Sequence, residues 1–335
     1  MTPNPAVEIL RLINGYQMTQ AIHVAASLGL ADHLKDGPRS AEELASLAQA
    51  HPAALYRLLR ALAAAGIFRE DDERRFSLTP MGNCLRSDSS TPMGAWAEFV
   101  GRPYVWQAWG HLLHSIKTDQ NAFSNLHGTS VWQYRIEHPE EGAVFDRAMT
   151  GLSGGAVETL VGAYSFADFR HVADIGGGQG QLIARILSAN ATLRGTLFDQ
   201  SHVVDKAGAL LTEAGVDDRC EIVAGNFFES VPSGADAYLL RAVLQCWEDQ
   251  EAIAILKACR RVMTEAAKLL IIEHILAPPN EGLAGKFADI NMLVLPGGRE
   301  RTRDEFSSLC AVAGFKLVGA VPAGPRYNVI EAKPV

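Results

Sequence analysis

The sequence predicts a helical, winged-helix N-terminal part followed by an α/β part of the Rossmann-like, doubly wound class. Three observations predict this fold. Helical periodicity extends to about residue 165, short apolar runs alternate with helices from about residue 170, and a glycine-rich turn at 174–180 joins the first such run to a helix. Alternating strands and helices are typical of a parallel sheet. With 335 residues, the chain is long enough for two hydrophobic cores.

The first segment, residues 1–35, carries apolar side chains at mixed helical spacing, including Ile9, Leu12, Ile22 and Leu28. Helical faces this apolar at a chain end usually bury themselves against another domain or against a second subunit. We favour the second subunit, so the sequence predicts a homodimer.

A winged-helix arrangement follows. Ser40 to Glu43 forms a capping-box pattern that begins a short helix. Pro52 begins a longer helix, for which Gly66 is the stop signal. Residues 67–78 hold two short apolar runs around a charged tip, which predicts a hairpin. Such a module either packs and dimerises or binds DNA.

Charge and composition exclude several functions. The formal net charge is -8, and the candidate recognition helix carries only Arg57 and Arg60, which argues against nucleic-acid binding. No apolar run reaches the roughly 18–20 residues of a membrane span, and no signal peptide is evident, so we expect a cytoplasmic protein. The five cysteines and ten histidines lack paired or metal-ligand spacing, which predicts reduced thiols and no metal.

Residues 92–165 are helical in pattern and rich in aromatic side chains. Most of these should be core, although the same side chains can line a pocket for a flat ligand. We therefore expect a winged-helix dimerisation domain at 1–95, a helical linker and substrate lid at 96–165, and an α/β domain at 166–335.

Seven apolar runs predict the strands of the α/β domain. They lie at 171–175, 195–199, 220–223, 236–244, 268–275, 315–320 and 327–332. The last two runs predict a closing hairpin.

The turn Asp174–Gly180 is the central motif. Its glycines, Gly176 and Gly178 among them, let a cofactor approach the backbone where a helix begins and N–H groups are unpaired. Asp174 precedes the glycines, and the last glycine comes one position early for the dinucleotide pattern. A carboxylate would repel a pyrophosphate, but it suits an ammonium group such as the methionine end of S-adenosylmethionine (SAM).

Two further segments suit the same ligand. Asp199 ends the second predicted strand, where a carboxylate can accept hydrogen bonds from both hydroxyls of a ribose. Asn226 and Phe227 follow the third strand, at the edge where open α/β sheets bind ligands. Asn226 can bond the edge of an adenine, and Phe227 can pack on its face.

With these residues in place, the chain resembles the plant caffeic-acid and isoflavone type O-methyltransferases and their bacterial natural-product relatives. The resemblance covers nearly the whole chain. Its most specific stretches are Asp174–Gly180, Gly225–Phe228, Asp236–Asp249 and Asn291–Phe306. It implies a SAM-dependent enzyme that methylates a small organic substrate, most readily on oxygen.

The resemblance also implies roles for single residues. Gly176, Asp199, Asn226, Phe227 and Arg241 stand at the family's SAM-contacting positions, and Trp247 at that of a tryptophan beside the cofactor. Asn226 replaces the usual aspartate. The family's substrate-side positions correspond to Trp109, Phe145, Met149 and Met292. Each of these residues could equally be an ordinary residue of the hydrophobic core.

The family's catalytic histidine is missing. At its position stands Gln245, and Cys246 replaces the aspartate that usually follows. The two acids that orient the histidine in the family are retained as Glu273 and Glu300. Here they have Gln245 or the substrate to orient. Both acids also have a purely structural alternative. Glu273 could cap a strand end or hold an ion pair, and Glu300 could stabilise the N-terminus of the helix that begins near Thr302.

A glutamine cannot take up a proton near neutral pH. Methyl transfer stays feasible without a base, because proximity and alignment alone can contribute roughly 7–11 kcal/mol. We therefore keep four alternatives: O-methylation by proximity or with another base, methylation of nitrogen or carbon, a non-methylating reaction such as cyclisation, hydroxylation or decarboxylation, and a SAM-responsive regulator. The candidate bases are Glu273, His111, His114 and His127; His274 is a poor one, because it should face away from Glu273.

Overall fold

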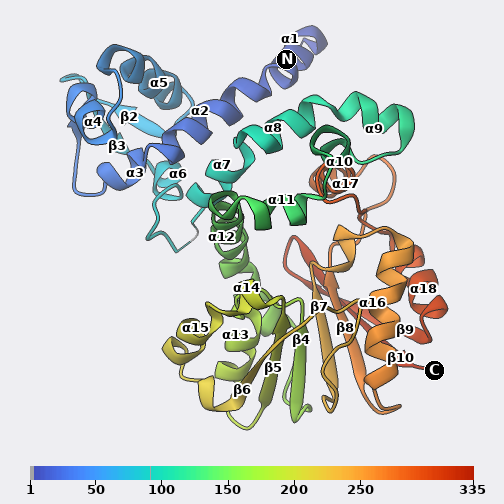
Figure 1. Cartoon of the computed structure of the whole chain (residues 1–335). Helices are drawn as coiled ribbons and strands as arrows, with labels where there is room; N and C mark the ends of the chain where they lie inside the picture. Colours follow the sequence, from blue (N-terminus) through green and yellow to red (C-terminus); the bar gives the residue numbers. More distant parts are fainter. Residues whose placement is uncertain (1–3, 91) are drawn as a thin grey trace. The chain divides into compact units, whose positions relative to one another are not determined.

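Residues 4–90 and 92–335 are described by the computed structural model, in which they form two units (Figure 1). The first unit comprises the residues up to 107 together with 133–152, and the second comprises 108–132 and 153–335. Residues 1–3, the start of the predicted helical segment, lie outside the described residues. No described helix is both long enough and apolar enough to span a lipid bilayer.

The first unit contains the predicted winged-helix elements. Its N-terminal helices are α1 (Pro5–Ile13), α2 (Gly15–Ser27), α3 (Leu30–His33), α4 (Ala41–Ala48), α5 (Pro52–Ala64) and α6 (Pro80–Asn83). The predicted capping box is confirmed, because Ser40 Oγ accepts the N–H of Glu43 and the Glu43 carboxylate accepts the N–H of Ser40. Helix α5 begins at Pro52 as predicted, and Gly66 follows it with φ of +78°.

A three-stranded sheet completes this winged helix. Its strands are β1 (Arg39–Ser40), β2 (Phe68–Glu70) and β3 (Arg75–Leu78), in the order β1-β3-β2. The hairpin of β2 and β3 was predicted. Strand β1 was not, because two residues are too few to show a periodicity.

Helix α1 exposes its apolar face in the single chain. Val7, Ile9, Leu10, Leu12 and Ile13 are all more than half exposed, and the helix buries no residue. Exposed apolar stripes of this kind mark interaction surfaces.

The predicted helical middle is confirmed as six helices. They are α7 (Gly94–Val100), α8 (Pro103–Gly110), α9 (Leu112–Thr118), α10 (Ala122–His127), α11 (Val131–Glu137) and α12 (Pro139–Ala163).

The second unit is built on a seven-stranded sheet. Its strands are β4 (His171–Ile175), β5 (Arg194–Asp199), β6 (Cys220–Ala224), β7 (Ala237–Arg241), β8 (Lys268–Glu273), β9 (Phe315–Ala323) and β10 (Tyr327–Pro334). Its remaining helices are α13 (Gln181–Ala189), α14 (Ser201–Val204), α15 (Ala207–Glu213), α16 (Asp249–Val262), α17 (Leu283–Val294) and α18 (Arg303–Val312), with 3-10 turns η1 (Asp217–Arg219) and η2 (Leu244–Cys246).

The strand order β6-β5-β4-β7-β8-β10-β9 confirms the doubly wound sheet with a closing hairpin. Strands β4 to β8 are parallel, and β10 pairs antiparallel with both β8 and β9. The chain leaves β4 toward β5 on one side and later returns to β7 on the other. A crevice at the carboxyl ends of β4 and β7 is therefore where such a sheet binds its ligand.

Alternating side chains put a core on each face of this sheet. On β7, Tyr238 and Leu240 join the core beneath α16 and α18, whereas Ala237 and Leu239 join the core beneath α13 and α15. Figure 1 shows these helix pairs on opposite sides of the strands.

Two predicted strands are too long, and one of them, predicted at 268–275, ends at Glu273. The apolar run 236–244 forms a strand only to Arg241, after which Ala242 takes φ of +54° and η2 begins. The run stays apolar because Val243 and Leu244 remain buried in the core after the strand has ended.

Candidate functional site

The turn between β4 and α13 is shaped by glycine backbone. Gly176, Gly178 and Gly180 have φ of +71°, +62° and +87°, where other residues are strained. A Cβ at Gly176 would lie 2.8 Å from Val243 Cγ2, whereas a Cβ at Gly178 would meet no protein atom within 4 Å. The turn therefore presents open backbone at Gly178, next to the N-terminus of α13.

Asp199 closes this turn from the neighbouring strand. Its Oδ2 accepts the N–H of Gly178 at 2.8 Å, and its Oδ1 accepts the N–H of Gln200 at 2.7 Å. These bonds hold the end of β5 against the glycine turn. The carboxylate thus lies at the carboxyl end of β5, against the glycine turn, and its bond to a ribose stays a prediction.

Asp174 lies beneath the turn. It is 1% exposed, neither carboxyl oxygen has a hydrogen-bond partner, and a Cβ at Gly177 would lie 2.7 Å from its Cγ. Burial raises its pKa to about 7, while the charge of Arg241 on adjacent β7 lowers it. Because the fold covers this carboxyl, it could act on an ammonium group only by electrostatic attraction and not by direct contact. Its role in binding stays a prediction.

Arg241 ends β7 and is half-buried. Its guanidinium lies 5.2 Å from the centre of the Tyr327 ring on β10. A cation stacked on an aromatic ring is held in one orientation. Arg241 therefore supplies a fixed positive charge at the carboxyl ends of the central strands.

An aromatic cluster borders the other side of the turn. The rings of Phe227 and Phe228 both meet Trp247 edge to face, with centroid distances of 6.1 and 4.8 Å, and Trp132 stacks on Trp247 at 6.4 Å. The side chain of Asn226 holds its own turn, because its Oδ1 accepts the N–H of Phe228 at 3.0 Å. Phe227 is thereby placed beside Gly176, where an adenine ring could pack on it.

Gln245 lies in η2 and is buried. Its main-chain N–H donates to Glu273 Oε1 at 3.2 Å. A Cβ at Gly298 would lie only 2.3 Å from the carbonyl oxygen of Gln245, so the loop before α18 reaches this turn only because residue 298 is glycine.

Two carboxyls that the sequence singles out are buried, one of them in contact with Gln245. Glu273 is fully buried and Glu300 is 6% exposed, and the Oε2 atom of each has no hydrogen-bond partner. Burial raises the pKa of Glu273 to about 7 and that of Glu300 to about 8, the latter also through the negative charge of Glu273. The backbone N–H of Glu300 donates to Asp289 Oδ1 on α17, at 2.9 Å.

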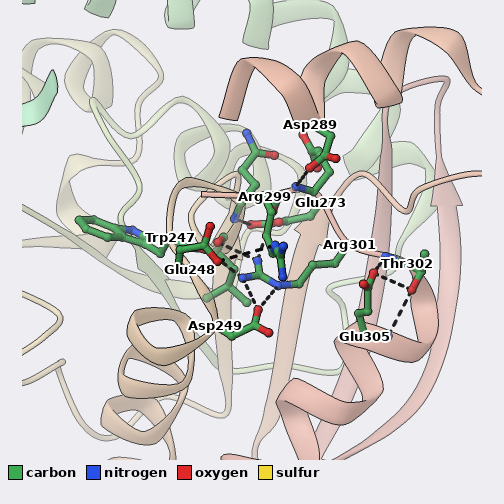
Figure 2. Close-up of polar contacts among 12 residues, drawn as sticks. Trp247, Glu248, Asp249, Glu273, Asp289, Arg299, Arg301, Thr302 and Glu305 are labelled. Atoms are coloured by element: carbon green, nitrogen blue, oxygen red, sulfur yellow. Dashed lines mark hydrogen bonds and ion pairs between the residues drawn. The ribbon is translucent and has the colours of Figure 1, made fainter. Parts of the chain in front are cut away.

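Glu300 does not cap the helix near Thr302, and its other role at that helix stays a prediction. Helix α18 is capped by Thr302 together with Glu305, whose carboxylate accepts the N–H of Thr302 (Figure 2). Glu273 forms no ion pair among the described residues, although it does accept the main-chain N–H of Gln245. Both carboxyls thus keep an acceptor that the protein does not use.

Arg301 fixes the turn that carries Gln245. Although it is 1% exposed, its guanidinium donates to Leu244 O, Trp247 O, Arg299 O and, through two nitrogens, Asp249 Oδ1. Figure 2 shows Arg301 reaching from the loop before α18 to Asp249 and Trp247. Sequence reasoning missed this residue, because an arginine in the largely charged stretch 299–305 has the pattern of an exposed loop.

The chain matches two protein-family models. The model of the O-methyltransferase domain matches residues 109–316, and that of the O-methyltransferase dimerisation domain matches residues 10–88. The chain belongs to the SAM-dependent O-methyltransferase family.

Curated relatives cover almost its full length. The phenazine O-methyltransferase PhzM of Lysobacter antibioticus is 42% identical over 98% of this chain and 96% of its own length. Other relatives are named for different reactions. An 8-amino-8-demethylriboflavin N,N-dimethyltransferase of Streptomyces davaonensis is 38% identical over 93% of this chain and 90% of its own, and the aclacinomycin 10-hydroxylase RdmB of Streptomyces purpurascens is 30% identical over 94% and 86%.

Solved structures share the fold, and one of them contains SAM. LaPhzM superposes with a TM-score of 0.96 at 41% identity, covering 99% of this chain and 100% of that one. The O-methyltransferase NcsB1 from neocarzinostatin biosynthesis, in complex with SAM and 2-hydroxy-5-methyl naphthoic acid, has a TM-score of 0.82 at 34% identity, covering 95% and 96%. This chain is therefore a SAM-dependent enzyme of the O-methyltransferase type.

The predicted substrate residues of this methyltransferase fall in both units. Trp109 donates from Nε1 to Asn291 Oδ1 at 3.0 Å, which anchors α8 to α17 beside Met292. Phe145 lies in the first unit, where the Arg135 guanidinium is 3.6 Å from its ring centre, and Met149 follows it on α12. Asn291 begins one of the stretches that carry the resemblance, but no role of its own was assigned to it from the sequence. Roles in substrate binding stay predictions for all four residues.

The candidate histidines pack elsewhere in the second unit. His111 stacks on His114 at 4.9 Å and bonds Asn125, and His127 stacks on Phe123 at 4.3 Å. His274 contacts Gly285 of α17, where a Cβ would lie 2.0 Å from its Cε1.

Each of these imidazoles packs against a neighbouring ring or helix. Glu273, another candidate base, accepts the main-chain N–H of Gln245. Across residues 4–90 and 92–335, no group of three acidic, histidine or cysteine side chains could hold a metal ion.

Proposed function

We propose that this methyltransferase transfers the methyl group of SAM to a hydroxyl oxygen of a small aromatic or polyketide-like metabolite, with Glu273 and Glu300 as the proton acceptors. The observation that carries the proposal is the pair of buried carboxyls beside Gln245, each with an oxygen that the protein leaves unpartnered. The names of relatives support the substrate class, since PhzM is called a phenazine O-methyltransferase and NcsB1 binds a naphthoic acid.

The residues at the carboxyl ends of β4, β5 and β7 fit SAM. Open backbone at Gly178 leaves room for the ligand, Asp199 can accept from ribose hydroxyls, and Phe227 offers a ring face beside Gly176. In this proposal Asp174 stabilises the cationic methionine end from below, Asn226 shapes the adenine edge, and Arg241 and Trp247 close the crevice. No pyrophosphate-binding function competes, because the buried carboxyl of Asp174 would repel one.

When bound, SAM supplies an electrophilic methyl group, whose C–S bond breaks as a C–O bond forms while sulfur keeps the electron pair. The hydroxyl oxygen of the acceptor must lose its proton in the same step. A carboxylate with a pKa near neutrality can take up that proton at physiological pH, as a general base requires. Glu273 and Glu300 have raised pKa values of this size.

Gln245 has a different task in this proposal. Its side chain can donate and accept hydrogen bonds but does not ionise near neutral pH. Its main chain already anchors Glu273 to the turn. We propose that the Gln245 amide positions the acceptor oxygen by a hydrogen bond. Glu273 and Glu300 then remove the proton.

The dimerisation match and the exposed face of α1 support a homodimer. We propose that residues 1–95 form its winged-helix dimerisation domain, 96–165 the linker and lid, and 166–335 the SAM-binding domain. Val7, Ile9, Leu12 and Ile13 would be covered by the second subunit. Light scattering at micromolar concentration tests this, since a monomer mass would contradict it.

N-methylation is the second candidate, favoured by the absence of the family's histidine base and by the relative named as an N,N-dimethyltransferase. An amine already carries its lone pair and needs less help from a base. The deciding experiment gives the purified chain SAM with a labelled methyl group and matched phenols, naphthols, hydroxyphenazines and arylamines. Label on oxygen supports the proposal, and label on nitrogen favours the second candidate.

SAM binding is measured separately by calorimetry. Binding of SAM without label transfer, combined with oxidation or decarboxylation of a test compound, would contradict O-methylation and favour a non-methylating reaction. Absence of SAM binding would contradict the whole assignment.

A further inference from the structure

The side-chain amide of Asn121 joins two elements of the second unit. Its Oδ1 accepts the N–H of Ser124 at 2.7 Å, which caps α10. Its Nδ2 donates to Leu293 O at 2.7 Å and to Leu295 O at 3.1 Å, at the end of α17. Because a backbone N–H can only donate and a carbonyl oxygen can only accept, these partners fix the orientation of the amide. Figure 1 shows α10 and α17 side by side.

The end of α17 depends on this amide. The last carbonyl groups of a helix have no partner within the helix, so they need donors from elsewhere. Met292 O accepts the N–H groups of Gly297 at 2.8 Å and Gly298 at 3.2 Å. The carbonyl groups that Asn121 bonds lie one and three positions further on. Gly297 packs on the same amide, since an added Cβ would lie 3.5 Å from Asn121 Nδ2, so the chain leaves α17 directly against this side chain.

The loop at 295–301 continues from this point to the turn of Gln245. Gly298 packs on the carbonyl oxygen of Gln245, from which an added Cβ would be only 2.3 Å away. At the other end of the loop, Arg301 donates to two carbonyl oxygens at η2. The loop over the turn is therefore anchored by Asn121 where it begins and by Arg301 where it ends.

Glu300 lies in this loop and depends on α17 in a second way. Its main-chain N–H donates to Asp289 Oδ1, on α17, at 2.9 Å. A displacement of the end of α17 would therefore move the main chain of Glu300 and the contact with Gln245 together. Asn121 thus controls the position of both residues, although it precedes Gln245 by 124 positions in the sequence.

We infer that Asn121 is a positioning residue for the acceptor side of the site, which acts through the loop at 295–301 to hold Glu300 and the turn of Gln245. This inference rests on the proposed function, because it takes these two residues as groups that act on the acceptor oxygen. The role requires an asparagine. Aspartate or serine would cap α10 equally well, but neither can donate to both carbonyl oxygens from this position.

Two substitutions separate the donor of Asn121 from its cap. Asn121→Asp keeps the shape of the side chain and turns a carboxylate oxygen toward the two carbonyl oxygens. Asn121→Ser keeps the cap without the added charge, so it controls for repulsion. Asn190→Asp is the matched control, because Asn190 is also half-buried and its Nδ2 donates to Ile186 O at 2.8 Å, at the end of α13.

Hydrogen–deuterium exchange of the full chain tests the inference without turnover. The main-chain N–H groups of Gln245 and Glu300 are bonded to side chains, so their exchange reports whether the turn and the loop stay closed. In both Asn121 variants we expect these two N–H groups to exchange at least about tenfold faster than in the wild type. Strand β4 should keep its protection, and Asn190→Asp should leave the exchange of Gln245 and Glu300 unchanged.

Three results would overturn the inference. Faster exchange confined to α10 and the end of α17 would show a merely local structural role. An equal loss of protection in β4 would show that the amide only stabilises the fold as a whole. The same effect in Asn190→Asp would show that any lost bond to a helix carbonyl loosens the turn.

Methyl transfer, measured beside the exchange, keeps this inference distinct from the proposed function. With labelled SAM and 2-naphthol, kcat of both Asn121 variants should fall at least about tenfold, while the affinity for S-adenosylhomocysteine stays unchanged. A wild-type rate in a variant whose turn exchanges faster would reject the positioning role and leave O-methylation intact. If the wild-type chain labels no oxygen, the proposed function fails, and the exchange of Gln245 and Glu300 still decides whether Asn121 holds the loop.

Discussion

Glu273 at the end of β8 and Glu300 in the loop before α18 form a buried pair of carboxyls, and the charge of the first raises the pKa of the second. The two residues are 27 positions apart in the sequence and belong to different elements. Because the main-chain N–H of Gln245 donates to Glu273, this turn carries a carboxyl whose pKa burial raises to about 7.

The pair predicts how the rate depends on pH. Both pKa values are raised, to about 7 and about 8, so the carboxyls are protonated below this window and ionised above it. Only the ionised form can take up the acceptor's proton. The value of kcat/KM for a phenolic substrate should therefore increase with pH between about 6 and about 9.

Glu300→Gln should remove the higher titration from this profile. The groups that surround Glu300 are Glu273, Asp289, Arg301 and Arg326, and all four remain in the variant. Asp304→Asn is the matched control and should preserve the wild-type profile. A wild-type rate that is independent of pH across this range would show that neither carboxyl acts as the base.

Gln245→His is predicted to increase O-methylation of weakly acidic phenols. An imidazole has an ordinary pKa of about 6.5 and would stand beside two carboxyls that can orient it. A general base contributes about 10²–10⁴-fold, and Glu273 and Glu300 already provide part of this, so we expect a gain of about tenfold at neutral pH. Gln245→Leu, which removes the amide without adding a base, should lower the rate. A loss in both variants would show that the glutamine amide itself is required.

The sequence predicted the sheet well because strand signals are local. All seven apolar runs became strands, and the capping-box residues Ser40 and Glu43 behave as their spacing indicates. The strand at 236–244 was drawn too long, because hydrophobicity reports burial and not backbone conformation. Val243 and Leu244 are buried after the chain has already turned at Ala242.

The site was harder to predict, because its geometry depends on segments that are distant in sequence. The resemblance indicated that Glu273 and Glu300 would flank Gln245, but not that the bond to Glu273 would come from the main chain. The buried position of Arg301 depends on carbonyl oxygens more than 50 residues away, and carbonyls have no sequence signature. Likewise, Asn291 meets Trp109 across 182 positions.

Arg301→Lys is predicted to destabilise the protein and disorder the turn of η2. A lysine has three donors and no fork geometry, so it cannot replace the bonds to Leu244 O, Trp247 O and Asp249 together. With net values of about 0.5–1.5 kcal/mol for each lost hydrogen bond, we expect a decrease in unfolding free energy of about 2–4 kcal/mol. Urea denaturation measures it.

Arg299→Lys is the control for this variant. Arg299 is exposed, and its ion pair with Glu248 spans 3.7 Å, so its loss should change stability by less than about 1 kcal/mol. Equal effects of the two lysine substitutions would contradict the assignment of Arg301 as the residue that holds the turn.

Gly178→Ala is predicted to weaken SAM binding without unfolding the chain. Gly178 has φ of +62°, and an added Cβ would meet no protein atom within 4 Å, so the protein itself only bears a backbone strain of about 1 kcal/mol. The methyl group would instead project into the space at the glycine turn that we assign to the cofactor. We expect the dissociation constant for SAM to increase at least about tenfold, or about 1.4 kcal/mol.

Gly215→Ala separates strain from cofactor contact. Gly215 follows α15, has φ of +65° and likewise has no atom within 4 Å of an added Cβ, so both alanines should lower the melting temperature similarly. Only Gly178→Ala should change the affinity measured by calorimetry. If Gly178→Ala binds SAM as tightly as the wild type, the cofactor does not pass over this backbone, and the contacts proposed for Asp199 and Phe227 lose their common basis.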